Sequence, residues 1–281
     1  YVLPLSVNYR GIFYNKKMLE EEGYQIPSTY SELIDTMQQI KKAGKLPIVF
    51  ADKDSWTVHQ GWDAIDMSSR GSQDDLFQKV LDGDALLYED SIALDSTRRY
   101  LEIRKYSQKQ TINTGYDEAV KTFANGEAYM FLQGNWAYPL IKKINPDIDL
   151  LFMPFPAYHE GDEKVVVKID ASLGVSASCT HTEAVGKFLD YVFSKKVSEY
   201  YAEEAGAYSC IKSVDVADKY AKAFTDSIRN GDFDLEEFAY ESDKSDARDA
   251  LFQNFFSSPQ RNTEKSFLKE WNDLFILLKG D

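Results

Sequence analysis

The segment from residue 116 to residue 140 constrains the fold of this chain more than any other. Apolar residues recur at helical spacing over residues 116–124, and Asn125-Gly126 follows as a helix stop. Residues 128–132 are apolar, and this run is short and aromatic enough to predict a buried strand. After a turn, Trp136 begins a new helix. This order of elements is typical of an α/β fold.

Trp136 is expected just past the carboxyl end of the predicted strand, after a turn at Gly134-Asn135. Ligands bind at that edge of the sheet in open α/β proteins. Two interpretations of Trp136 are open at this point. Its indole contacts a ligand, or it fills the core, as most tryptophan side chains are largely buried.

A second α/β unit precedes this segment. Thr29 and Glu32 form a Thr-x-x-Glu capping box, and apolar residues at i, i+3 and i+4 continue the helix to residue 40. Gly44 and Pro47 end the helix, and residues 48–51 predict a buried strand.

Aromatic residues follow directly after that strand. Trp56, His59 and Trp62 recur every three residues, so on a helix we expect them near one another on one side. With Asp63 they would make a stacking platform with polar tips. The alternative is a helix facing the core, which we favour for His59; for Trp56 both interpretations stay open.

Elsewhere the chain predicts further elements with less detail. The first fifteen residues predict two short strands with a polar turn around Asn8–Arg10. Thr180 and Glu183 predict a second capping box, before an amphipathic helix that ends by Gly206. Further helices follow: residues 226–250 are acidic and expected in solvent, and Trp271 in the last helix is expected in the core.

Composition excludes several classes of function. The formal charge of −14 argues against nucleic acid and against an anionic membrane surface, since both attract clustered Lys and Arg. No apolar run reaches 18 residues, and no phosphate loop, nucleophile elbow or metal-ligand spacing occurs. Two carboxylates in a cleft, as in a glycosidase, stay possible. Cys179 and Cys210 are a disulfide pair or two free thiols.

Several motifs, in order, resemble the extracellular sugar-binding proteins that serve ABC importers. They are Y-x-L-P-x-S-x-N-x-x-G-I-x-Y-N-K-K (residues 1–17), P-S-T-Y-S-E-L (27–33), F-A-N-G-E-A-Y-M-x-x-x-G-N-W (123–136) and M-P-F-P (153–156). The resemblance covers essentially the whole chain, and the order and spacing of the motifs carry it.

The resemblance implies an α/β, periplasmic-binding-protein-like fold of two lobes, similar to maltose-binding protein. Residues 1–156 and 208–281 would form mainly the second lobe with its helices, and residues 157–207 would return to an incomplete first lobe. The N-terminal third of the family's pattern would precede residue 1. A monomer is expected, either periplasmic or a cell-surface lipoprotein of a Gram-positive bacterium.

The resemblance also suggests which residues contact the ligand. Trp136 matches the family's G-x-W tryptophan, whose indole stacks on a sugar ring, and Trp56 matches an aromatic site after the earlier strand. Asn8 and Arg10 lie in the first crossover motif, and Asp170 lies at the returning crossover. The full set of expected ligand-binding residues is Trp136, Asn135, Trp56, His59, Trp62, Asn8, Arg10 and Asp170.

One departure from maltose-binding protein concerns the ligand. A stacking tryptophan of that protein corresponds here to the polar segment 241–246, which argues against a long maltodextrin. We therefore expect a non-enzymatic protein, without cofactor or metal, that binds a mono- or oligosaccharide for the permease subunits of an ABC importer. The alternatives are another small polar solute, a glycoside hydrolase, or an interaction module without ligand.

Overall fold

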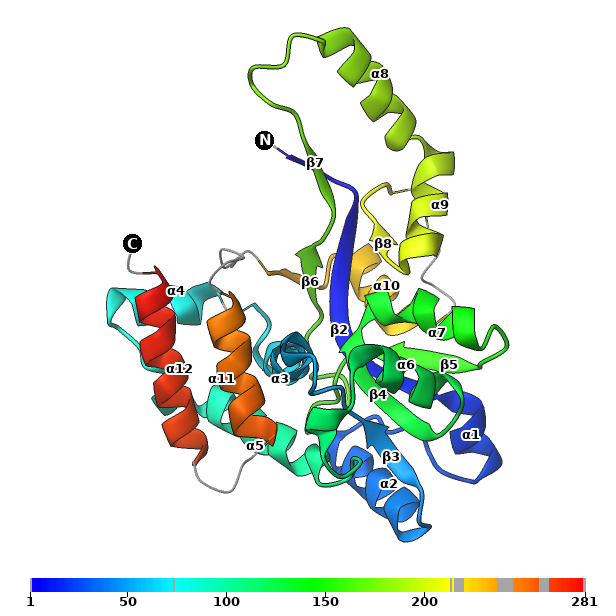
Figure 1. The fold of residues 1–281 in the computed structure, drawn as a ribbon, viewed down its shortest axis with the longest axis vertical. Coiled ribbons are helices and arrows are strands. Elements are labelled where there is room, and N and C mark those ends of the chain that lie inside the picture. Colours follow the sequence, from blue (N-terminus) through cyan, green and yellow to red (C-terminus); the bar gives the residue numbers. More distant parts are fainter. Residues whose placement is uncertain are drawn as a thin grey trace.

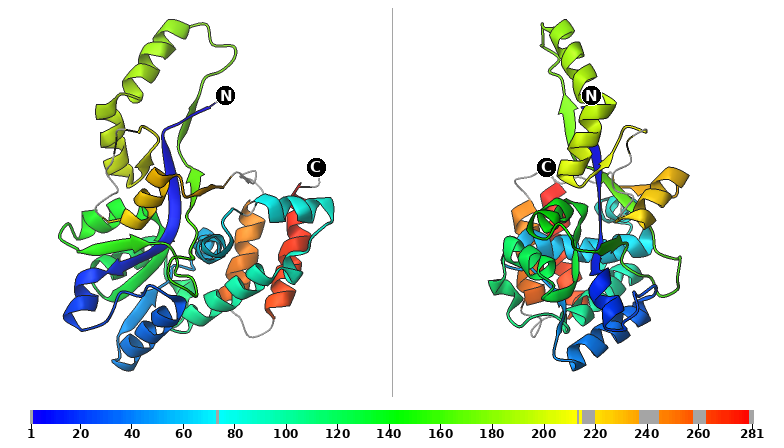
Figure 2. Two further views of the ribbon diagram at one scale, coloured as in Figure 1. Left: turned by 180° about the vertical axis from the view of Figure 1, so that it is seen from behind. Right: turned by 90° about the vertical axis from the view of Figure 1, so that its right-hand side faces the viewer.

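The computed structural model describes residues 2–72, 74–212, 214, 220–236, 245–257 and 263–279. It consists of a layered body and an arm that stands off from it in every view (Figures 1 and 2). We define the arm by four elements: β1 (Val2–Pro4), β7 (Ser172–Gly174), α8 (Thr182–Val192) and α9 (Lys195–Ala205). The other elements form the body.

Strand β2 (Ser6–Asn15) is the long strand on which the body is built. Its first half pairs with β6 (Val166–Ile169) and β8 (Tyr208–Ser209), both antiparallel. Its second half pairs with β4 (Ala128–Gly134) and β5 (Leu150–Met153), also antiparallel. The expected polar turn around Asn8–Arg10 is therefore wrong. The backbone stays extended there because each half of the strand has its own hydrogen-bonded neighbours.

Two more strands complete the sheet that the described residues form. Strand β3 (Leu46–Val49) runs parallel to β4, and β9 (Asp234–Leu235) runs parallel to β6. Strand β3 begins two residues earlier than residues 48–51, the range that the sequence predicts. The parallel β3–β4 pair matters most for function, since two carboxyl ends meet at one edge of the sheet.

Helices cover both faces of the sheet (Figure 1). Along β2, Ile12 and Tyr14 face one hydrophobic core, and Tyr9 and Phe13 face the other, as the two-residue period of a strand requires. The first core is closed by α2 (Tyr30–Lys42), α3 (Ser55–Arg70), α5 (Ser91–Arg104), α11 (Ser245–Ser257) and α12 (Glu264–Lys279). The second is closed by α6 (Tyr116–Ala124), α7 (Tyr138–Ile144) and α10 (Lys222–Asn230). The remaining short helices are α1 (Lys16–Glu21), α4 (Asp74–Asp82), η1 (Leu87–Glu89), η2 (Thr111–Asn113) and η3 (Asn135–Ala137).

Helix α2 forms as its sequence predicts. The Thr29 hydroxyl accepts from the Glu32 amide at 3.3 Å, and the Glu32 carboxylate accepts from the Thr29 amide at 3.2 Å, which confirms the capping box. Gly44 ends the helical region at a φ of 76°. The inward side chains Leu33 and Met37 are fully buried.

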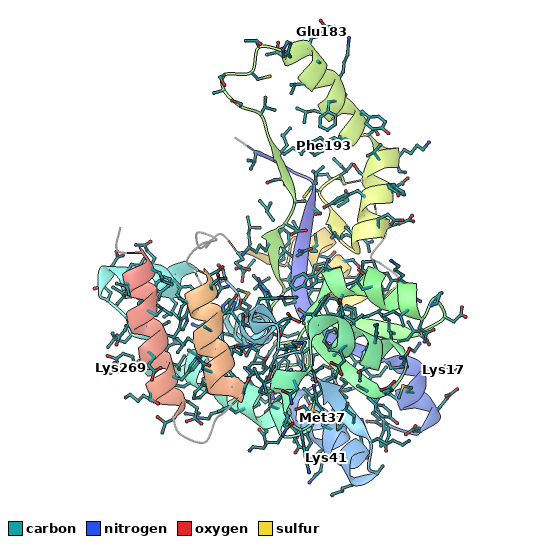
Figure 3. The ribbon with its side chains drawn as sticks, in the orientation of Figure 1. Lys17, Met37, Lys41, Glu183, Phe193 and Lys269 are labelled. Atoms are coloured by element: carbon teal, nitrogen blue, oxygen red, sulfur yellow. The ribbon has the colours of Figure 1, made fainter. Side chains whose placement is uncertain are left out.

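The second predicted capping box is wrong. Helix α8 begins at Thr182 after His181, and no side chain caps it. Glu183 instead forms an exposed ion pair with Lys187 at 2.8 Å. Its place explains this: Glu183 lies at the far tip of the arm (Figure 3), where no neighbouring element fixes the helix start.

The apolar face of α8 is largely uncovered in this structure. None of its residues is buried, and Phe188 and Tyr191 are 55% and 67% exposed. Phe193, at the junction with α9, is partly exposed as well (Figure 3). An amphipathic helix normally places this face against a core.

The C-terminal helices pack on the body, and Trp271 is completely buried, which confirms its predicted place in the core. The acidic stretch 226–250 is not uniformly in solvent. Asp249 is 6% exposed, and the Glu236 side chain is 9% exposed. Residues 237–244, which include most of the polar segment 241–246, lie outside the described residues.

Both cysteines, Cys179 and Cys210, are free thiols. Among the described residues, no helix has the length and apolar character to cross a membrane.

Candidate functional site

Three aromatic side chains gather at the edge of the sheet where β3 and β4 end. Trp136 lies in η3, directly after β4; Trp56 lies in the first turn of α3, after β3; and Tyr116 begins α6. The Trp56 ring centroid is 6.2 Å from that of Trp136 and 5.1 Å from that of Tyr116. All three are partly exposed. We call Trp136, Trp56 and Tyr116 the aromatic wall.

Gly134 sets the position of the Trp136 indole. A Cβ atom at Gly134 would lie 2.1 Å from the indole ring, so any side chain there would displace the ring. Gly134 pairs with Arg10 across the β2–β4 ladder, and directly paired residues face the same side of a sheet. The indole therefore lies over the bare glycine backbone, next to Arg10.

Asp54 joins the two helix starts behind the wall. It is the residue before α3, and its carboxylate accepts a 2.6 Å hydrogen bond from the Tyr116 amide at the start of α6. A carboxylate is favourable at this place, because the free amides of a helix start carry partial positive charge. Trp56 and Tyr116 are thereby held against each other.

A group of charged and polar side chains lies next to the wall. Arg10 bonds Gln60, which is one helical turn after Trp56, and forms an ion pair with Glu236 at 2.8 Å. Lys168 bonds the other carboxylate oxygen of Glu236 at 3.3 Å. Asn8 pairs with Lys168 across β2 and β6. We call Asn8, Arg10, Gln60, Lys168 and Glu236 the polar strip.

The charge of Arg10 is stable near neutral pH. Burial by itself would lower the pKa of Arg10, but Glu236 and Asp63 outweigh it, so this pKa is raised. Burial also opposes ionisation of Asp63, yet His59, Arg10 and Arg248 hold its pKa below the ordinary value. Arg10 therefore presents a fixed charge that can hydrogen-bond neutral hydroxyl groups.

His59 and Trp62 do not join the aromatic wall. His59 is buried, bonds Asp63 at 3.1 Å and meets Phe252 of α11 edge-on. Trp62 is 2% exposed, and its Nε1 donates to Thr97 at 3.0 Å. Trp56 and Trp62 do not share one face of α3, because successive side chains of an α-helix point about 100° apart around its axis. The side chain of Trp62, six residues after Trp56, therefore points toward α11 and α5.

Asn135 is completely buried and bonds three neighbours. Its side-chain oxygen accepts from the Tyr9 amide at 2.9 Å, and its Nδ2 donates to the Gly206 carbonyl at 2.8 Å and to Asn8 Oδ1 at 3.3 Å. These bonds join β2, the end of β4 and the residue after α9. In this structure Asn135 positions Trp136 and is covered from solvent.

Asp170 follows β6 and is exposed, with its amide donating to the Ser6 carbonyl at 3.0 Å. Partial burial of its carboxyl group raises its pKa, against a hydrogen bond from Asn8 and the charge of Lys168. Asp170 therefore lies at the crossover near Asn8, at the end of the polar strip.

Sequence reasoning did not identify Tyr116, Gln60, Lys168 or Glu236 as site residues. Gln60 had a usable signal, because residues four apart on a helix are neighbours. Lys168 interrupts an otherwise β-branched run, which also marks it. Glu236 is 226 positions from Arg10 and has no local signal.

Two larger cavities elsewhere in the described part of the chain lack a comparable aromatic wall. A cavity of about 640 Å³ between α5 and α11 is lined largely by charged and polar residues such as Arg98 and Glu102. Another of about 640 Å³ lies behind the first half of β2, next to Cys210 and Phe233. No group of three or more potential metal ligands occurs among the described residues.

The fold and this site define a class of protein, and a family profile agrees. The profile of the bacterial extracellular solute-binding proteins matches residues 1–199, and the chain belongs to that family. The mixed α/β architecture of this chain matches that of solved two-lobe binding proteins. RafE in complex with raffinose aligns over 99% of this chain and 73% of that chain, with a TM-score of 0.82 and 23% identity.

Curated relatives include sugar-binding proteins. The multiple sugar-binding protein of Streptococcus mutans is 28% identical over 223 residues, which cover 76% of this chain and 52% of that protein. The melibiose/raffinose/stachyose-binding protein MelE of Bacillus subtilis is 21% identical over 170 residues, 59% of this chain and 40% of that protein. The chain thus spans about half the length of the first of these relatives.

Proposed function

We propose that this protein binds a carbohydrate on the aromatic wall and delivers it, outside the membrane, to the permease subunits of an ABC importer. The observation that carries the proposal is the arrangement of Trp136, Trp56 and Tyr116 beside the polar strip. Sugar rings offer apolar C–H faces to aromatic planes and hydroxyl groups to charged side chains. The sugar-binding names of two relatives support the same class of ligand.

We further infer that β7, α8 and α9 of the arm belong to the family's first lobe, which closes over the wall. In this division, residues 1–156 and 208–281 form one lobe with its helices, and residues 157–207 belong to the other. Support comes from the exposed apolar face of α8 and from the alignment, which covers 73% of the RafE chain. Closure of two lobes around a ligand excludes water from the hydrogen bonds. The working protein would be a monomer, periplasmic or anchored as a lipoprotein.

Individual residues have different proposed roles. Trp136 and Trp56 stack on sugar rings, while Arg10, Asn8 and Asp170 bond hydroxyl groups. Asn135 acts indirectly, by fixing the backbone that carries Trp136. His59 and Trp62 support α3 from its other side.

Calorimetry of the complete protein against mono-, di- and oligosaccharides tests the proposal. We expect saturable binding of one sugar class, and at least a tenfold loss of affinity in Trp136→Ala. Tyr158→Ala is the control, because Tyr158 is an aromatic residue of the body that is 54% exposed outside the wall. If no sugar gives a heat of binding, the ligand is another small polar solute.

The same samples test for catalysis. A glycosidase needs one carboxyl group that donates a proton. Asp170, at the end of the polar strip, has a raised pKa, but the family and the relatives of this chain are binding proteins. We therefore expect each sugar to be recovered unchanged, and product formation would contradict a pure binding role.

A further inference from the structure

The aromatic wall continues well past Trp136, the residue that the sequence marks. The centroid distances along it are 6.2 Å from Trp136 to Trp56 and 5.1 Å from Trp56 to Tyr116. Neighbouring rings are tilted by 52° and 57°, so the wall is curved. Each step is of the order of one pyranose ring, so a single monosaccharide covers only part of the wall.

A cavity extends the wall beyond Trp56. It has a volume of about 460 Å³, within the range of small-ligand sites. Trp56 and Tyr116 form its aromatic side, and Lys53, Asp54, Asp117 and Glu118 bring polar atoms to it. We call it the Tyr116 cavity. Trp136 does not line it, so the two ends of the wall are separate places.

The polar side chains of the Tyr116 cavity suit hydroxyl groups. Lys53, Asp117 and Glu118 are exposed, and within the described residues none of them forms an ion pair. Carboxylates accept hydrogen bonds from hydroxyls, and an ammonium group donates them. The cavity therefore offers both kinds of partner next to an aromatic plane, as a sugar requires.

Two buried polar atoms of the aromatic wall have no hydrogen-bond partner among the described residues. In the described part of the chain, Trp136 Nε1 and Tyr116 Oη are buried without a hydrogen-bond partner. Buried polar groups nearly always have one. Both atoms have almost no accessible surface, so a ligand contacts the exposed faces of these rings and not these two atoms.

We propose that the ligand is an oligosaccharide of at least three rings, with one ring on Trp136, one on Trp56 and one in the Tyr116 cavity. This inference rests on the proposed function and adds a chain length and a third subsite to it. Tyr116 supplies the plane of that subsite, and Asp117 and Glu118 are its hydroxyl acceptors.

Asp117 and Glu118 also lie in the first turn of α6, where acidic residues stabilise a helix through the partial positive charge of its free amides. The test must separate this effect from ligand contact. Glu127→Gln is the matched control, because Glu127 is an exposed acidic residue just past the other end of α6. Thermal unfolding of each variant measures the contribution to the helix alone.

The experiment is calorimetry of the complete protein with two series of sugars. One series is galactose, melibiose, raffinose and stachyose; the other is glucose, maltose, maltotriose and maltotetraose. In the series that binds, we expect the affinity to rise at least tenfold when the third ring is added. The double variant Asp117→Asn/Glu118→Gln should remove most of that rise, as should Tyr116→Ala, and Glu127→Gln should keep it.

Each other outcome overturns a defined statement. Equal affinity for a monosaccharide and its trisaccharide would end the three-ring inference and leave the proposed function intact. The same holds if the rise survives in both Tyr116 cavity variants. No binding in either series would overturn the proposed carbohydrate function, and the inference with it.

Discussion

Helices α2 and α8 have similar sequence patterns and opposite surroundings. Both are amphipathic, and α2 places Leu33, Met37 and Ile40 in the core with no exposed surface. In α8, Phe188 and Tyr191 are 55% and 67% exposed. Hydrophobic periodicity therefore predicts that a helix forms and which face is apolar, but not what covers that face. The comparison of body and arm can be tested at four kinds of site.

The largest difference is expected for ion pairs. Arg10→Met leaves the Glu236 carboxylate, 9% exposed, with only Lys168, so we expect a loss of roughly 3–5 kcal/mol in unfolding free energy. Lys187→Met breaks the exposed Glu183 pair on the arm and should cost less than about 0.5 kcal/mol. Urea unfolding of both variants measures the difference, and equal losses would contradict it.

Core packing should show the next largest difference. Leu33→Ala removes a fully buried side chain of α2 and should cost about 2–5 kcal/mol. Phe188→Ala removes a larger but exposed side chain of α8, so this chain should change by less than about 0.5 kcal/mol. The same substitution in the complete protein sharpens the comparison. A large loss there would show that another segment covers α8.

Acid should destabilise the body through His59. Its burial, together with the charge of Arg248, lowers the pKa of His59 against the opposing effect of Asp63. The unfolded chain therefore binds the proton first, and stability falls as the pH drops below about 6.5, by at most about 1.4 kcal/mol per pH unit for one proton. Unfolding free energies from pH 7 to pH 5 should fall less steeply in His59→Gln. A slope in His59→Gln as steep as that of the parent protein would contradict this effect.

Glycine gives the smallest effect. Gly186 lies inside α8, and a Cβ there would meet no atom within 4 Å. Gly186→Ala should therefore stabilise the helix by about 0.5–1 kcal/mol, because alanine has the higher helix propensity. At Gly61 of α3, a Cβ would lie 2.5 Å from the Tyr100 hydroxyl, so the same change should destabilise the body. Thermal unfolding followed by circular dichroism compares the midpoints of the Gly186→Ala and Gly61→Ala variants with that of the parent protein.

These contrasts also explain how far the sequence could predict the structure. The capping box of α2 and the order α6–β4–η3 followed from local chemistry, since caps, stops and short apolar runs act over a few residues. The capping box at Thr180 failed at the tip of the arm, where α8 begins at Thr182 without a side-chain cap. The predicted turn around Asn8–Arg10 failed because polar residues there belong to a strand that lines the polar strip.

The candidate site was predictable only in part. Trp136 and Trp56 were expected at the ends of two strands, and the structure brings them within 6.2 Å. Trp62 was grouped with Trp56 by spacing alone, although helical rotation separates them. Glu236 reaches Arg10 only because β9 pairs with β6, and two-residue strands leave no periodic signal.

The three hydrogen bonds of Asn135 have a mechanical consequence. One of them ends on the Gly206 carbonyl, directly after α9, so the end of the arm is bonded to the residue beside Trp136. Swinging the arm away stretches this bond and, once it breaks, leaves a buried amide unsatisfied at a cost of about 1–3 kcal/mol. The Gly206 carbonyl also accepts from the Tyr220 hydroxyl at 2.8 Å, so two side chains of the body hold the end of α9, and one of them also fixes the backbone that carries Trp136.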